Sequence, residues 1–119
     1  MIGSFFAIVL ATTDGDTFRA RLEVWPGVEV VTAVRLRGID TPEIHGKCSA
    51  EKAAALAAKA RLAALLAGGR VEVSQVTLDK FAGRIDGLVS VDGVRVDGVL
   101  IAEGLARPYT GGARLPWCP

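Results

Sequence analysis

Three short polar segments interrupt apolar stretches of this sequence, and together they hold the groups that phosphate chemistry needs. They are residues 14–17, 35–43 and 79–84. Carboxylates in such segments bind hard cations, and arginine side chains match the geometry of phosphate. If the chain folds so that the three segments converge, they form a site for cleaving or holding a phosphodiester.

The oxygen ligands come from the first two segments. Asp16 and Asp40 are hard donors that suit Ca²⁺ or Mg²⁺ and not a soft metal. Glu43 follows Asp40 by three residues and could orient an attacking water through its carboxylate. Taken alone, Asp14 is better explained as a turn residue, because Asp-Gly is a common turn pair.

The cationic groups are Arg35 and Arg84. A divalent ion, a carboxylate base and two arginines make up the minimal set for hydrolysing a phosphodiester, since metal and guanidinium stabilise charge on the phosphate. Each arginine alone could also be a solvated surface residue, and Arg35 shares its strand face with Arg37 by alternation. The combination of three segments is the stronger signal.

Length and charge limit what the chain can be. Its 119 residues suit one domain, and its net charge is only +1. The longest apolar run has seven residues, against roughly 20 for a membrane helix, so we expect no membrane span. A near-neutral protein does not coat nucleic acid by bulk charge, so any attraction to phosphate must be local.

Alternating and helical patterns predict the elements that position these segments. We expect strands at 5–12, 17–25, 28–38, 70–78 and 84–91, a short extension at 94–96, and helices at 49–67 and 97–106. The apolar start lacks a basic segment and a cleavage site that leaves a sensible mature start, so we expect a buried first strand rather than a secretory signal. In the first helix, Ser49 is the expected N-cap. Its expected buried stripe consists of Leu56, Leu62, Leu65 and Leu66.

The order of these elements predicts the fold class. Three strands, a helix, two strands and a short helix suit an α+β, mainly β protein, a five-stranded OB-type barrel with its helix between strands three and four. An open α+β sheet is the alternative. The predicted domain covers residues 4–110, and 111–119 form a C-terminal tail.

The two cysteines allow one disulfide. Cys118 lies in the tail, and a bridge to Cys48 would tie that tail to the domain; two unpaired thiols are the alternative. With His45 they could also be drawn as a partial zinc site, but three ligands at this spacing do not resemble a zinc ribbon.

In this order, the segments resemble the staphylococcal-nuclease (thermonuclease) family. The matching stretches are Asp14-Gly15-Asp16-Thr17, Arg35-Leu36-Arg37-Gly38-Ile39-Asp40-Thr41-Pro42-Glu43, Asp79-Lys80-Phe81-Ala82-Gly83-Arg84 and Gly104-Leu105-Ala106. The similarity spans roughly residues 5 to 110, and the second stretch is its most specific part. The resemblance implies an OB-type barrel, in agreement with the predicted strand order.

The resemblance also implies a reaction, which is Ca²⁺-dependent hydrolysis of DNA and RNA that leaves 3′-phosphates. By resemblance, Asp16, Asp40 and the Thr41 carbonyl are the metal ligands, Glu43 is the general base, and Arg35 and Arg84 bind the scissile phosphate.

We assign substrate contacts to Arg37, Lys80 and Tyr109, the last as a stacking surface. Monomer is the default state.

Three features depart from the family pattern. Ala82 adds a residue to the turn before Arg84, the loop around His45 is short, and a Gly- and Pro-rich tail replaces the usual C-terminal helix. The alternative function is therefore a barrel with weak or no catalysis that binds single-stranded nucleic acid or a protein partner. The compartment stays open, since a Cys48–Cys118 bridge favours export and the lack of a visible leader argues the other way.

Overall fold

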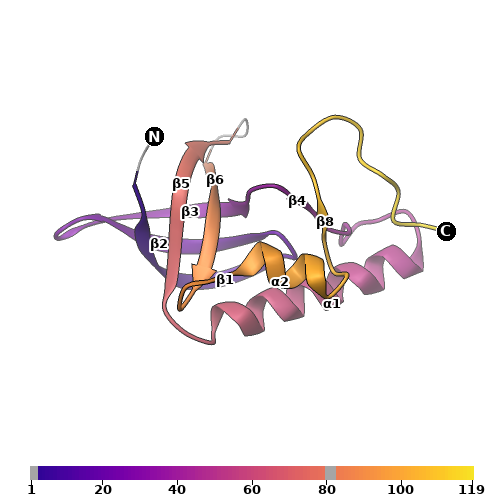
Figure 1. Cartoon of the computed structure of the whole chain (residues 1–119), viewed down its shortest axis with the longest axis horizontal. Helices are drawn as coiled ribbons and strands as arrows, with labels where there is room; N and C mark the ends of the chain where they lie inside the picture. The colour runs from indigo at the N-terminus through magenta and orange to yellow at the C-terminus, as the bar shows by residue number, and fades with distance from the viewer. Residues whose placement is uncertain (1–2, 80–82) are drawn as a thin grey trace.

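A closed barrel of five strands forms the body of the protein (Figure 1). The computed structural model describes residues 3–79 and 83–119. The barrel strands are β1 (Phe5–Asp14), β2 (Thr17–Trp25), β3 (Val28–Leu36), β5 (Val71–Leu78) and β6 (Arg84–Val91). They pair in the order β3-β2-β1-β5-β6, and a parallel pairing of β3 with β6 closes the ring. This mixed barrel with two helices confirms the predicted OB-type class.

Two helices and three short strands complete the chain. They are β4 (Ile39–Asp40), α1 (Ser49–Leu66), β7 (Val94–Arg95), α2 (Val96–Ala102) and β8 (Arg107–Pro108). β4 and β8 pair with each other in a small separate sheet. Figure 1 shows both helices along one side of the barrel, and the tail after β8 loops outward before it returns to the start of α1. Within the described residues, no helix is long and apolar enough to cross a membrane.

The core follows from strand alternation. In β2 the alternate side chains of Phe18, Ala20 and Leu22 are buried, while Arg19 is exposed, as predicted. The two helices add Leu62 and Leu100, both fully buried. The core therefore fills the barrel interior and the space between the barrel and the helices. The site residues lie at the rim of the barrel.

Two expectations about burial are wrong. β1 is not buried throughout, because Phe6, Ile8 and Leu10 on its outer face are 44–56% exposed and only the alternate residues face inward. On α1, Leu56 is 57% exposed. Leu62 and Leu66 are buried as predicted, and Ala55, Ala58 and Glu51 complete the buried stripe of α1. Neither the apolar run of β1 nor the number of leucines in α1 shows which face of the element points inward. In α1, small alanines allow closer packing than leucines.

Two helix boundaries also differ from prediction. The N-cap of α1 is Cys48 rather than Ser49, and the Cys48 sulfur accepts a hydrogen bond from the Glu51 N–H at 3.4 Å. α2 begins at Val96 and ends at Ala102 instead of Ala106. Gly104, with φ of +75°, adopts the left-handed conformation that ends helices, and it lies inside the predicted span.

Candidate functional site

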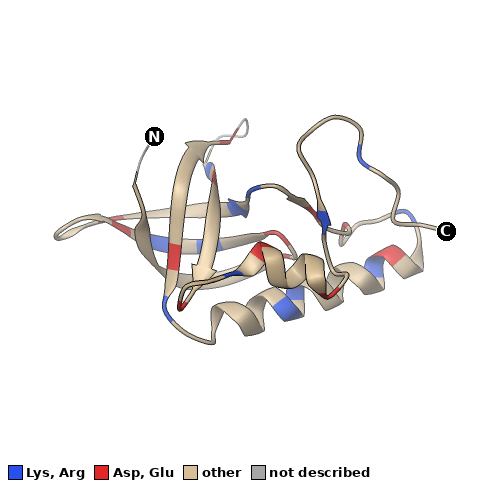
Figure 2. Cartoon of the chain, viewed as in Figure 1, with Lys and Arg blue, Asp and Glu red and all other residues tan. Residues whose placement is uncertain are grey.

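A cavity of about 560 Å³ opens at one end of the barrel, and described residues of all three polar segments line it. Its lining comprises Asp14, Asp16, Thr17, Arg35, Asp40, Glu43, Asp79, Arg84, Asp86, Tyr109 and Arg114. These include six carboxylates and three guanidinium groups, a formal charge of −3. Figure 2 shows acidic and basic positions interspersed over the chain as a whole. The cavity is thus a local acidic site in a nearly neutral protein, and it favours a cation.

Asp16 reaches this cavity from the tight turn between β1 and β2. A Cβ at Gly15 would lie 2.7 Å from the Ala58 Cβ and 3.3 Å from that of Thr41, so only glycine lets the turn pack against α1 and the β4 loop. The Asp16 N–H donates to Asp14 Oδ1 at 3.1 Å, and the Thr17 hydroxyl donates to Asp16 Oδ1 at 2.9 Å. Packing and local hydrogen bonds thereby fix this carboxylate.

The surroundings of the Asp16 carboxyl favour its protonated form when no cation is bound. Burial raises its pKa from 3.8 to about 6, helped by the neighbouring Asp14, while Arg35 and Thr17 oppose the change. The compensating ion pair with Arg35 Nη2 is 3.5 Å long. A buried carboxylate that holds its proton this strongly is well suited to gaining a positive partner.

Asp40 and Thr41 come from β4 and the residue after it. β4 is held by β8, which pairs Asp40 with Arg107, and both Asp40 and Thr41 are buried. The next hydrogen bond of this small sheet runs from the Tyr109 N–H to the Gly38 carbonyl at 2.8 Å. The pairing places Asp40 and Tyr109 in the same cavity although they are far apart in sequence.

Glu43 lies on a loop that the Glu51 side chain holds in place. The Glu51 carboxylate accepts hydrogen bonds from the backbone N–H groups of Glu43 and Lys47, each 3.1 Å long. These two hydrogen bonds lower the pKa of Glu51. A Cβ at Gly46 would lie 2.5 Å from the Glu51 carboxyl carbon, so a larger residue there would displace this carboxylate. Glu51 thus sets the path of the loop that carries Glu43.

Arg35 and Arg84 enter the cavity from neighbouring strands. The parallel pairing of β3 with β6 places Arg35 beside Asp86 and Arg84 beside Ala33. Arg35 Nη2 donates to the Ile39 carbonyl at 3.2 Å, and Arg84 pairs with Asp79 at 3.1 Å. Both side chains are about a quarter exposed. Both guanidinium groups therefore line one cavity, which is the convergence that the sequence analysis took as its condition.

Asp86 is a cavity residue that the sequence analysis did not single out. Burial raises the pKa of Asp86, and the neighbouring Asp79 carboxyl raises it further, while Arg35 and Arg37 act in the opposite sense. Alternation along β6 was the signal, because Asp86 lies two residues after Arg84 and shares its face. It adds negative charge close to the arginines.

Arg114 and Trp117 of the tail contact the site, which the sequence analysis did not predict. Arg114 Nε donates to Asp40 Oδ1 and Nη1 donates to Glu43 Oε1, both at 2.6 Å, while Nη2 donates to the Thr41 carbonyl at 3.1 Å. Trp117 Nε1 donates to the other Asp40 oxygen at 3.0 Å. One tail segment therefore contacts two predicted metal ligands and the predicted base.

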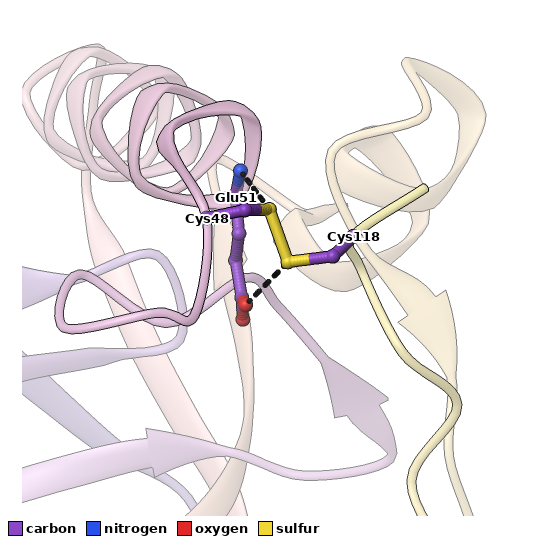
Figure 3. Close-up of side chains that lie close together, drawn as sticks. All are labelled: Cys48, Glu51 and Cys118. Carbon is purple, nitrogen blue, oxygen red and sulfur yellow. Dashed lines mark hydrogen bonds between the residues drawn. A yellow bond between two sulfur atoms is a disulfide. The ribbon is translucent and has the colours of Figure 1, made fainter.

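A disulfide between Cys48 and Cys118 holds that tail against the first turn of α1 (Figure 3). Cys118 Sγ lies 3.6 Å from Glu51 Oε1, so the bridge also abuts the carboxylate that supports the Glu43 loop. These three residues are spaced as a metal cluster could be, but disulfide sulfurs lack the thiolate that binds a metal. His45 is exposed and is not part of this cluster.

Of the three residues predicted to contact substrate, one lines the cavity. Tyr109 lines the cavity, and its hydroxyl donates to the Gly112 carbonyl at 2.7 Å. Arg37 is not in the cavity lining; its Nη2 donates to the Gln75 carbonyl and the Thr77 hydroxyl on β5. β3 ends at Leu36, so strand alternation does not extend to Arg37. Lys80 and the extra Ala82 lie outside the described residues.

The donors present fit a hard divalent cation. Asp40, the Thr41 carbonyl and Glu43 already surround one positive group, the Arg114 guanidinium, and the donor atoms are all oxygens. Asp16 lines the same cavity, and a nearby cation would lower its raised pKa. Oxygen-only donors favour Ca²⁺ or Mg²⁺ over a softer metal.

Comparison with known proteins gives the family. The family model described as "Staphylococcal nuclease homologue" matches residues 33–114, about two thirds of the chain. The chain belongs to this family. The matched part of the chain includes Arg35, Asp40, Glu43 and Arg84, whereas the hairpin that carries Asp16 precedes it. No match was found among curated proteins.

Proposed function

We propose that this protein is a Ca²⁺-dependent nuclease that hydrolyses phosphodiester bonds of DNA, with RNA as a second substrate, and leaves 3′-phosphate ends. Family membership supports a nuclease in general. The observation that carries the finer proposal is the convergence of Asp40, the Thr41 carbonyl and Glu43 on one cationic group, beside two arginines in the same cavity.

Each side chain has a distinct part in the proposed reaction. Asp16, Asp40 and the Thr41 carbonyl hold the metal ion, which when bound supplies positive charge beside the phosphate. Glu43, more than half exposed, accepts a proton from the attacking water at its carboxylate. Arg35 and Arg84 donate their forked N–H groups to the non-bridging phosphate oxygens, where negative charge grows.

Positioning in this scheme comes from two sources. Strand pairing between β3 and β6 fixes the two arginines relative to one another. Glu51 fixes the loop of Glu43 through two backbone hydrogen bonds. Tyr109, next to β8, offers an aromatic ring at the cavity on which a base can stack.

A plasmid-nicking assay with the metal varied tests the proposal. Supercoiled plasmid should be nicked with Ca²⁺, and excess chelator should stop the reaction. Glu43→Gln should remove most of the activity, whereas the matched control Glu29→Gln, which alters an ion pair with Arg21 on the β2–β3 hairpin, should keep it. Nicking that continues undiminished in chelator would overturn the metal requirement.

The second candidate function is a barrel that binds single-stranded nucleic acid or a protein partner without cutting. The Arg114 contacts with Asp40 and Glu43 favour it, since they occupy the groups that catalysis needs. Retention of a labelled oligonucleotide in a gel-shift assay, with no cleavage at any Ca²⁺ concentration, would support this alternative. Cleavage with 3′-phosphate products would exclude it.

A further inference from the structure

The tail offers a positive group at the place where the proposed metal ion would bind. Arg114 forms an ion pair with Asp40, 94% of whose side chain is buried, and its three nitrogens together contact Asp40, Glu43 and the Thr41 carbonyl. Trp117 takes the remaining Asp40 oxygen. Both oxygens of this carboxylate are therefore engaged by tail donors.

These contacts are favourable enough to matter in competition. An arginine guanidinium keeps its positive charge at any pH at which the protein would work. Charge-assisted hydrogen bonds from a guanidinium are among the strong ones in proteins. The guanidinium therefore stays charged and is a true rival for a cation.

The disulfide keeps this rival close to the site. Cys118 is four residues after Arg114 and is bonded to Cys48 at the start of α1. Arg107, at the other end of the segment, donates to the Leu115 and Pro116 carbonyls and stacks on the Trp117 ring at 3.6 Å. A segment tied at both ends has a high effective concentration at its target.

We propose that Arg114 is an internal competitor of the divalent ion, so that the disulfide-tied tail sets how much free metal the site requires. The proposal rests on the proposed metal-dependent function and adds a determinant of metal affinity to it. A metal ion can take the Asp40 oxygens and the Thr41 carbonyl only when Arg114 leaves them. The apparent dissociation constant therefore rises by the inverse of the fraction of protein whose site is open.

Calcium titration of purified variants, followed by calorimetry in the absence of DNA, tests the competition. Arg114→Gln should bind Ca²⁺ on the order of tenfold more tightly than the wild type, the factor expected if the tail covers the site in about nine molecules of ten. Arg84→Gln is the matched control for charge, because it removes one positive charge from the same cavity, and the ion pair of Arg84 is with Asp79. It should change the affinity much less.

Cys118→Ser tests the tether with every charge retained. It should also tighten Ca²⁺ binding, by less than Arg114→Gln does, since an untied tail still visits the site. The double variant should bind no more tightly than Arg114→Gln alone, because both substitutions act on one contact.

Trp117 gives a second readout that does not depend on activity. In a Trp25→Phe background, Trp117 is the one remaining tryptophan. Its emission should shift to longer wavelength as Ca²⁺ is added, because the ring leaves Asp40 with the tail. A saturating red shift with the calorimetric midpoint supports the proposal.

Equal Ca²⁺ affinity in wild type and Arg114→Gln overturns the competition, and if both still nick plasmid, the proposed function stands. A Trp117 emission that Ca²⁺ saturation leaves unchanged overturns it equally. Absence of Ca²⁺ binding in every variant, together with absence of nicking, overturns both the competition and the proposed function.

Discussion

The two halves of the site are built by different means. Asp16, Arg35 and Arg84 lie on barrel strands or their tight turn, where hydrogen-bonded neighbours fix each position. Asp40 ends the short strand β4, and Thr41 and Glu43 follow in the loop after it. This segment is held by more distant parts, namely β8, the Glu51 carboxylate and the disulfide-tied tail. The barrel half thus depends on the fold itself, and the loop half depends on a few replaceable contacts.

The largest effect should come from the barrel half. Arg35→Gln or Arg84→Gln should lower the rate of plasmid nicking by about 100-fold or more, because each removes a charged donor to the phosphate. Since strand pairing rather than the side chain positions the backbone, far-ultraviolet circular dichroism should not change. Arg95→Gln, whose ion pair with Asp97 lies outside the cavity, is the control. A loss under threefold would refute the assignment.

The tether of the loop half can be broken at Cys118. Cys118→Ser should lower the free energy of unfolding by about 2–4 kcal/mol, because the bridge closes a loop with a sequence separation of 70 residues. Urea unfolding followed by circular dichroism measures this. An unchanged midpoint would mean that the tail contributes nothing to the folded state.

In the barrel half, the ionised form of Asp16 that would bind a metal is the form that lowers stability. Its pKa is about 6 in the folded protein against 3.8 for the free side chain, so in the absence of metal the folded protein loses stability as pH rises from 3.8 to about 6, and the loss stays constant above that. The cost is on the order of 3 kcal/mol at pH 7 and vanishes as pH falls below 3.8. In chelator, Asp16→Asn should therefore melt higher than wild type at pH 7.5, and the difference should shrink at pH 4.5. A lower melting temperature at pH 7.5 would contradict this.

Support for the loop half can be weakened at Glu51. Glu51→Ala should lower the nicking rate about ten- to a hundredfold, the usual range for removing a group that orients a catalytic one. Glu51→Gln keeps an oxygen that accepts one of the two N–H groups and should restore part of the rate. If Glu51→Ala kept full activity, or if Gln rescued nothing, Glu51 would not position Glu43 in the way described.

The same contrast explains what the sequence could predict. Alternation in β2 and the segments around Arg35 and Arg84 are local patterns, and they predict the barrel and the cavity that these residues share. Asp86 could have been found by the same alternation. The burial of α1 could not, because packing of Ala58 against Gly15 depends on contacts that no local pattern records.

The tail could be predicted least. Cys118 indicated that the tail returns to the domain, but nothing around Arg114 or Trp117 indicates that both reach Asp40, more than 70 residues earlier. Glu51 supports the Glu43 loop through two backbone hydrogen bonds, and its place in the first turn of α1 does not indicate that role. Long-range hydrogen bonds of single side chains leave no periodic signal in a sequence.

The central claim is that the cavity is a metal-dependent phosphodiesterase site, and nicking of supercoiled plasmid across a Ca²⁺ titration tests it most directly. We predict nicking that rises with Ca²⁺ and saturates, stops in excess chelator, and is reduced at least about 100-fold by Glu43→Gln and by Arg35→Gln. Nicking that is independent of Ca²⁺, or equal in wild type and these two variants, would contradict the claim.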